Sequence, residues 1–79
     1  MVTIENILNY FNNVMKDLRV VTICKTPDKY IIHTESKTRD DSMDGVYATP
    51  RGELKVSEYP YMAKLEEYKK ALKNVVYRK

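Results

Sequence analysis

Apolar residues near the N-terminus recur every three to four positions, which is the period of an amphipathic α-helix. They are Ile4, Ile7, Leu8, Phe11, Val14, Met15 and Leu18. Thr3 precedes the run and is a favourable N-cap, and Glu5 would sit at the positive end of the helix dipole. The pattern predicts a helix over Thr3–Leu18 that buries Phe11.

Two runs rich in β-branched residues follow, Val20–Ile23 and Tyr30–Thr34. The segment between them, Thr26-Pro27-Asp28-Lys29, is typical of a turn because proline presets one dihedral angle and aspartate can bond to the backbone. We therefore expect a β-hairpin.

A pairing of Lys25 with Tyr30 would decide which side chains share each side of this hairpin. Ile23 would then face Ile32, and Val21 would face Thr34, on one side. The other side would carry Thr22, Cys24, Ile31 and His33.

The rest of the chain predicts a charged loop, a second strand pair and a closing helix. The loop covers residues 36–44, the strands are Val46–Thr49 and Leu54–Ser57, and the helix is Pro60–Asn74. The apolar face of that helix would comprise Tyr61, Leu65, Tyr68, Leu72, Val75 and Val76. The order α-β-β-β-β-α predicts a small α+β fold, an antiparallel sheet with both helices on one face.

Length and composition favour a single globular domain over residues 1–79, since 43% of the 79 residues are hydrophobic and 32% are charged. No apolar run is long enough for a membrane span, and the first residues do not resemble a signal peptide. The only cysteine is Cys24. We therefore expect a cytoplasmic protein in a reducing compartment.

Candidate chemistry is sparse, because His33 is the only histidine and the chain has two glycines. Cys24 and His33 would be diagonal neighbours in the hairpin, but nothing in the sequence suggests an oxyanion hole beside them. The segment 40–45 has oxygen side chains spaced like the start of a calcium loop, yet Arg51 stands where the bidentate glutamate belongs. We expect no enzyme activity, no catalytic residues, no cofactor and no metal site.

The net charge of +3 comes from the C-terminal part of the chain, because acidic and basic residues balance up to Ser57. The basic residues of the end are Lys69, Lys70, Lys73, Arg78 and Lys79. On a helical wheel Lys69 and Lys73 share one flank, while Lys70 points away from it. This end could bind phosphates, so a small nucleic-acid-binding protein is the alternative hypothesis.

The leading hypothesis is a non-catalytic interaction protein, such as a phage-type accessory factor or an inhibitor that binds a host macromolecule. Tyrosine and arginine are enriched at protein interfaces, and lysines can complement an acidic partner. The predicted partner-binding residues are Tyr47, Arg51, Tyr59, Lys69, Lys73 and Arg78.

We also expect a homodimer, because helices on one face would leave the other face of the sheet open to water. The predicted dimer interface comprises Thr22, Cys24, Ile31 and His33.

Overall fold

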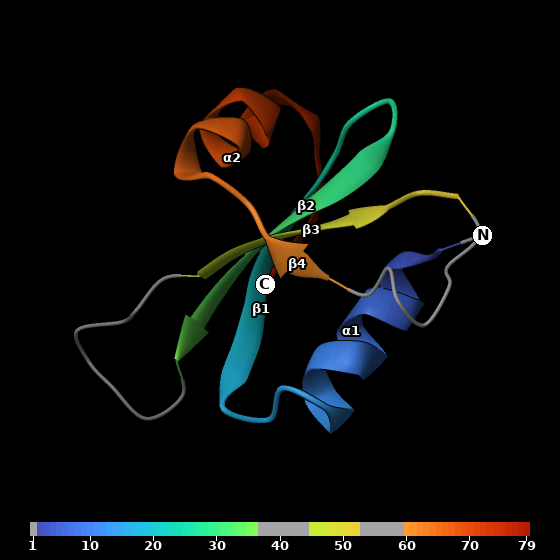
Figure 1. Ribbon diagram of the computed structural model, residues 1–79, viewed down its shortest axis with the longest axis vertical. Helices are drawn as coiled ribbons and strands as arrows, with labels where there is room; N and C mark the ends of the chain where they lie inside the picture. The colour runs from blue at the N-terminus through green and yellow to red at the C-terminus, as the bar shows by residue number, and fades with distance from the viewer. Residues whose placement is uncertain (1, 37–44, 53–59) are drawn as a thin grey trace.

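A computed structural model of the chain describes residues 2–36, 45–52 and 60–79 (Figure 1). Its helices are α1 (Ile4–Asn13), α2 (Leu65–Ala71) and the short 3-10 helix η2 (Leu72–Asn74). Its strands are β1 (Leu18–Lys25), β2 (Lys29–Ser36), β3 (Gly45–Pro50), β4 (Tyr61–Met62) and β5 (Val75–Arg78). They form one antiparallel sheet in the order β4-β3-β2-β1-β5, which confirms the α+β class.

Helix α1 begins as the sequence predicts, with Thr3 as its N-cap. The Thr3 hydroxyl accepts a hydrogen bond from the Asn6 backbone N–H at 3.1 Å, and the Asn6 side-chain oxygen accepts one from the Thr3 N–H at 3.0 Å. The helix ends at Asn13, earlier than the predicted Leu18. Met15 and Leu18 still pack against the same core, from the turn after the helix and from the start of β1.

The β1–β2 hairpin has the predicted register from Lys25 opposite Tyr30 to Thr22 opposite His33. The register then shifts, so that Val20 and not Val21 lies opposite Thr34. Such a β-bulge reverses the alternation of side chains. Val20 thereby joins Ile23 on the same face of the sheet and is buried.

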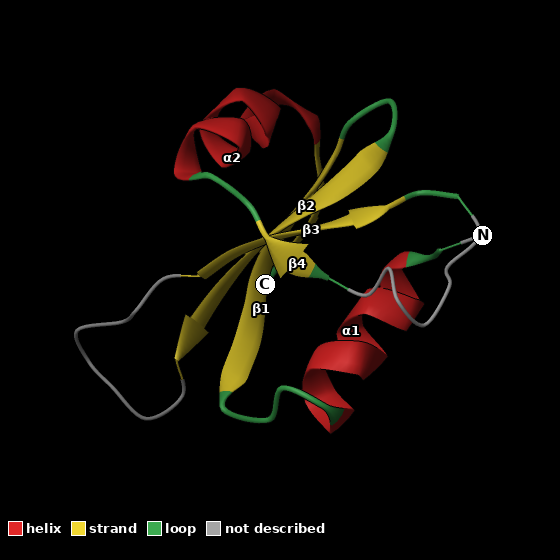
Figure 2. Cartoon of the chain, in the orientation of Figure 1, coloured by secondary structure: helices red, strands yellow, loops and turns green. Residues whose placement is uncertain are grey.

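The two helices cover opposite faces of the sheet, so the prediction that they share one face is wrong (Figure 2). One core, beneath α1, comprises Val2, Ile7, Phe11, Val20, Ile23 and Ile32. The second, beneath α2, comprises Cys24, Ile31, Val46, Ala48 and Ala71. Strands with apolar side chains on both faces need a layer on each side to exclude water.

The C-terminal third also differs from the predicted helix Pro60–Asn74. Tyr61–Met62 pairs with β3, α2 starts only at Leu65, and Val75–Arg78 returns as a strand beside β1. Without β5, backbone N–H and C=O groups at the outer edge of β1 would be unpaired. The backbone of β5 pairs with this edge, and its two valines favour the strand conformation. The predicted strand Leu54–Ser57 lies outside the described residues.

The surface predicted for the homodimer lies inside the chain. Thr22, Cys24 and Ile31 are at most 3% exposed, and His33 stacks on Tyr68 of α2 with ring centroids 4.9 Å apart. The dimer is expected there because that face of the sheet would otherwise be open to water, but α2 covers it. Within the described residues, no helix has the length and apolar character needed to cross a bilayer.

Candidate functional site

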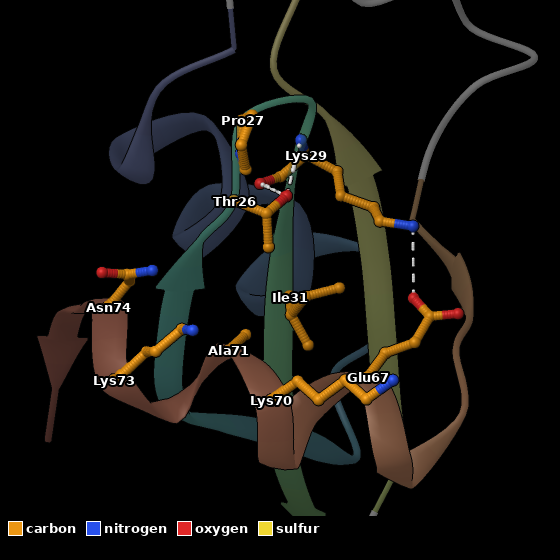
Figure 3. A pocket seen from close by; sticks show the side chains of 9 residues that line it. All are labelled: Thr26, Pro27, Lys29, Ile31, Glu67, Lys70, Ala71, Lys73 and Asn74. Carbon is orange, nitrogen blue, oxygen red and sulfur yellow. Dashed lines mark hydrogen bonds and ion pairs between the residues drawn. The ribbon is translucent and has the colours of Figure 1, made fainter.

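A groove of about 300 Å³ opens between the β1–β2 turn and the helical segment α2–η2 (Figure 3). We call it the α2 groove. Its lining residues are Thr26, Pro27, Lys29, Ile31, Glu67, Lys70, Ala71, Lys73 and Asn74. The hairpin turn forms one wall of the groove, and the helical segment forms the other (Figure 3).

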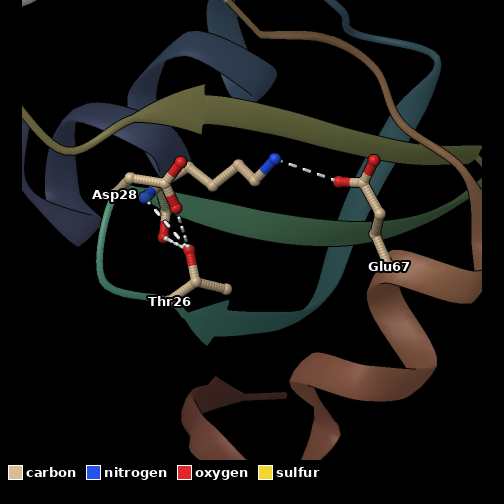
Figure 4. Close-up of polar contacts among 4 residues, drawn as sticks. Thr26, Asp28 and Glu67 are labelled. Carbon is tan, nitrogen blue, oxygen red and sulfur yellow. Dashed lines mark hydrogen bonds and ion pairs between the residues drawn. The ribbon is translucent and has the colours of Figure 1, made fainter.

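The hairpin tip that forms one wall is held by a network centred on Thr26 (Figure 4). The Thr26 hydroxyl accepts a hydrogen bond from the Lys29 backbone N–H at 3.1 Å. It lies 3.0 Å from a carboxylate oxygen of Asp28 and 2.9 Å from the Lys29 carbonyl. Threonine and aspartate stabilise turns in this way because their short side chains reach nearby backbone groups.

Arg51 fastens the same turn from outside the hairpin. Its guanidinium donates hydrogen bonds to the carbonyls of Thr26 at 2.9 Å and Pro27 at 3.2 Å. The same group lies 6.0 Å from the centre of the Tyr30 ring, within the range of a cation–π contact. Arg51 therefore supports the turn that forms one wall, although it does not itself line the groove.

An ion pair between Lys29 of β2 and Glu67 of α2 joins the two walls at one end, with a nitrogen–oxygen distance of 3.2 Å (Figure 3). The hydrogen bond and charge of the Glu67 side chain raise the pKa of Lys29 above its ordinary value, and partial burial opposes this rise. The pair satisfies both charges. Lys73 and Asn74 lie at the other end of the groove, and the Lys70 side chain extends toward Glu67 (Figure 3).

The floor and the rim of the groove differ in character. Ile31 and Ala71 form the floor and are 1% and 4% exposed. Lys70 and Lys73 stand on the rim as exposed side chains. Lysine stems cover apolar surface while their ammonium groups remain in water. The groove can therefore accept an apolar group against its floor and an anionic group beside the lysines of its rim.

The predicted partner-binding residues are scattered. Tyr47 is half-buried on the α1 face, where its ring meets Phe11 at 5.4 Å, and Arg51 holds the turn. Tyr59 lies outside the described residues.

Of the predicted cations, only Lys73 lines the α2 groove. Lys69 is exposed on α2, and Arg78 is exposed at the end of β5. Lys29, Glu67 and Lys70 are groove residues that the prediction did not include. The contact between β2 and α2 joins residues far apart in the sequence, so no local sequence pattern predicts it. The three-residue spacing of Lys70 and Lys73, in contrast, is a local pattern that indicates neighbouring positions on a helix.

Cys24 and His33 have the predicted register: Cys24 pairs with Ile31 and His33 pairs with Thr22, so the two are diagonal neighbours on the same face. The Cys24 side chain is fully buried, and burial raises the pKa of its thiol, an effect that the nearby charge of Arg78 opposes. In residues 2–36, 45–52 and 60–79, no group of three His, Cys, Asp or Glu side chains could hold a metal ion.

No family model, curated protein or solved structure matches the chain.

Proposed function

We propose that the chain is a non-catalytic interaction protein that binds a protein partner on its α2 side, as a phage-type accessory factor or an inhibitor of a host macromolecule would. The observation that carries the proposal is the α2 groove, which combines a buried apolar floor with an exposed cationic rim. Interfaces concentrate their binding energy in such apolar sites surrounded by polar groups.

The environment of Cys24 supports a role without catalysis. A cysteine nucleophile must be an accessible thiolate, whereas Cys24 is buried and its pKa is raised. The free thiol also fits a cytoplasmic location, which is part of this proposal.

The test is a pull-down with the wild-type chain from a lysate of the cells in which it is made, with and without nuclease. A protein that is captured at a fixed ratio after nuclease treatment supports the proposal. Capture that disappears completely with nuclease contradicts it and favours a nucleic-acid partner.

The second candidate, nucleic-acid binding, draws on the exposed cations Lys69, Lys73 and Arg78. Arg78 lies opposite Thr22 in the β1–β5 pairing, on the side of the sheet that carries Cys24 and is covered by α2. Lys79 instead lines a hollow with Leu8 of α1, on the other face. The basic end is thus divided between two faces, which weakens it as a single phosphate-binding surface.

A gel-shift titration at low salt tests this candidate. Replacing Lys69, Lys73 and Arg78 by glutamine should weaken binding to all sequences and lower its salt dependence by about one unit per lost phosphate contact. Replacing Lys16, Lys25 and Lys79 by glutamine removes the same charge at other exposed positions, so it is the matched control and should change both much less. No shift of any oligonucleotide by the wild type would remove the candidate.

A further inference from the structure

We propose that the α2 groove binds an acidic peptide segment that inserts an aliphatic side chain between the hairpin tip and α2. This names the chemistry of the partner and rests on the proposed function. The proposal commits to a peptide because the floor and the rim of the groove each select for one of its features.

The floor selects for an aliphatic group. Ile31 and Ala71 present methyl groups at the bottom of the groove, and Pro27 forms an apolar edge on the turn. No aromatic ring is among the described residues that line it. Single-stranded nucleic acids bind by stacking bases on aromatic side chains, so this floor suits an aliphatic side chain better than a base.

The rim selects for negative charge. Three lysines and one glutamate line the groove, and the glutamate is paired with Lys29. Lys70 and Lys73 form no ion pair within the described residues, so their charges are available to a ligand. Carboxylates of a peptide can meet these ammonium groups at the mouth while its apolar side chain is buried.

The walls of the groove are already in place. The hairpin tip is held by Thr26 and Arg51, and the Lys29–Glu67 pair joins it to α2. A preformed site loses less conformational entropy on binding. A volume of about 300 Å³ is at the small end for ligand sites, and it suits one or two side chains of a peptide.

The experiment uses NMR on the full chain, with isotopic labels in the backbone amides and in the isoleucine and alanine methyl groups. The probe is a synthetic peptide in which glutamate alternates with leucine. We expect fast-exchange shifts centred on Ile31, Ala71, Lys70 and Lys73, with a dissociation constant on the order of 0.1–1 mM. The same peptide with serine in place of leucine should bind at least about tenfold more weakly.

Charge reversal on the protein gives the matched comparison. Lys70→Glu with Lys73→Glu should raise the dissociation constant by about five- to tenfold. Lys16→Glu with Lys25→Glu makes the same change in net charge at exposed positions that do not line the groove. This control pair should bind the peptide within about twofold of the wild type. The serine peptide tests the floor in the unmodified protein, whatever the variants do.

Several outcomes would overturn the proposal: no shifts at millimolar peptide, shifts that map outside the groove, or equal binding of a peptide with lysine in place of glutamate. Tighter binding of a short oligonucleotide in the same groove would also overturn it. A different result is that the peptide fails to bind in the groove while the pull-down still captures a protein after nuclease treatment. That combination would show that the partner uses another surface. In that case the proposed function stands and only the peptide site falls.

Discussion

The Lys29 ammonium and the Glu67 carboxylate lie 3.2 Å apart, although they come from two elements far apart in the sequence, strand β2 and helix α2. Their contact connects the first hairpin to the second helix and closes one end of the α2 groove. It is the single described ion pair between the sheet and a helix.

Removing this ion pair should destabilise the fold only slightly. Side-chain exposures of 28% and 42% leave the pair in contact with water, where such pairs contribute about 0.2–1 kcal/mol. A double-mutant cycle with Lys29→Met and Glu67→Gln, followed by urea unfolding, measures the coupling. The cycle on Arg19 and Glu35, a pair within the hairpin, is its control. A coupling above about 2 kcal/mol would contradict this account.

The same pair predicts a loss of stability at alkaline pH. Glu67 raises the pKa of folded Lys29 above 10.5, so the folded chain holds this proton more tightly than the unfolded chain. The contribution is complete below the unfolded pKa and is lost as pH rises through the folded one. The free energy of unfolding of the wild type should therefore fall toward that of Lys29→Met above about pH 10.5. Parallel curves would contradict this prediction.

Phe11 and Leu65 should respond very differently to truncation, although both were expected in the core. Phe11 is fully buried against Tyr10 and Tyr47, whereas Leu65 is 48% exposed. Phe11→Ala should cost about 3–5 kcal/mol by opening a cavity, and Leu65→Ala less than about 1 kcal/mol. Urea midpoints compare them. Equal losses would place Leu65 in the core and refute the position of α2.

With the β-bulge, Val20→Ala should destabilise the protein more than Val21→Ala, whereas a regular ladder would predict the opposite order. Val20 is buried opposite Thr34, and Val21 is half-buried. Val20→Ala should therefore cost about 2 kcal/mol and Val21→Ala about half as much. Thermal unfolding of both variants decides between the registers, because an unbulged hairpin would reverse the order.

Ile31→Lys tests whether the α2 face of the sheet is internal. Ile31 is 1% exposed, so a lysine there would place an unpaired charge in the second core and cost about 3–5 kcal/mol. Circular dichroism should show that the variant has lost cooperative unfolding. If this face were an open dimer surface, the same change would release folded monomers.

The elements that the sequence predicts well depend on near neighbours. The Thr3 cap and the hairpin register from Lys25 to Thr22 are both correct. Each is encoded by residues a few positions apart, through side-chain bonds to the backbone or through the geometry of a short turn. The sequence does not predict the bulge, because the bulge turns Val20 toward the core beneath α1. Which face of the sheet α1 covers is known only from the tertiary structure.

The C-terminal errors have a different origin. Val75 and Val76 continue a helical pattern and are also good strand residues, so their local preference is ambiguous. Pairing with the free edge of β1 favours the strand conformation for these residues. The helix therefore ends before Val75, and Lys73 lies beside the groove. The groove itself was not predicted, because Lys29 and Glu67 meet only after the chain has crossed the sheet.

The sequence by itself therefore determined the α+β class, the first helix, the hairpin and its turn, because these follow from periodicity and from contacts between close neighbours. Only the tertiary structure decided that the helices take opposite faces, that Thr22, Cys24 and Ile31 are internal, and that Lys70 and Lys73 border a groove. The physical reason is that both faces of the central strands are apolar. Covering each of them is a property of the whole chain and not of any segment.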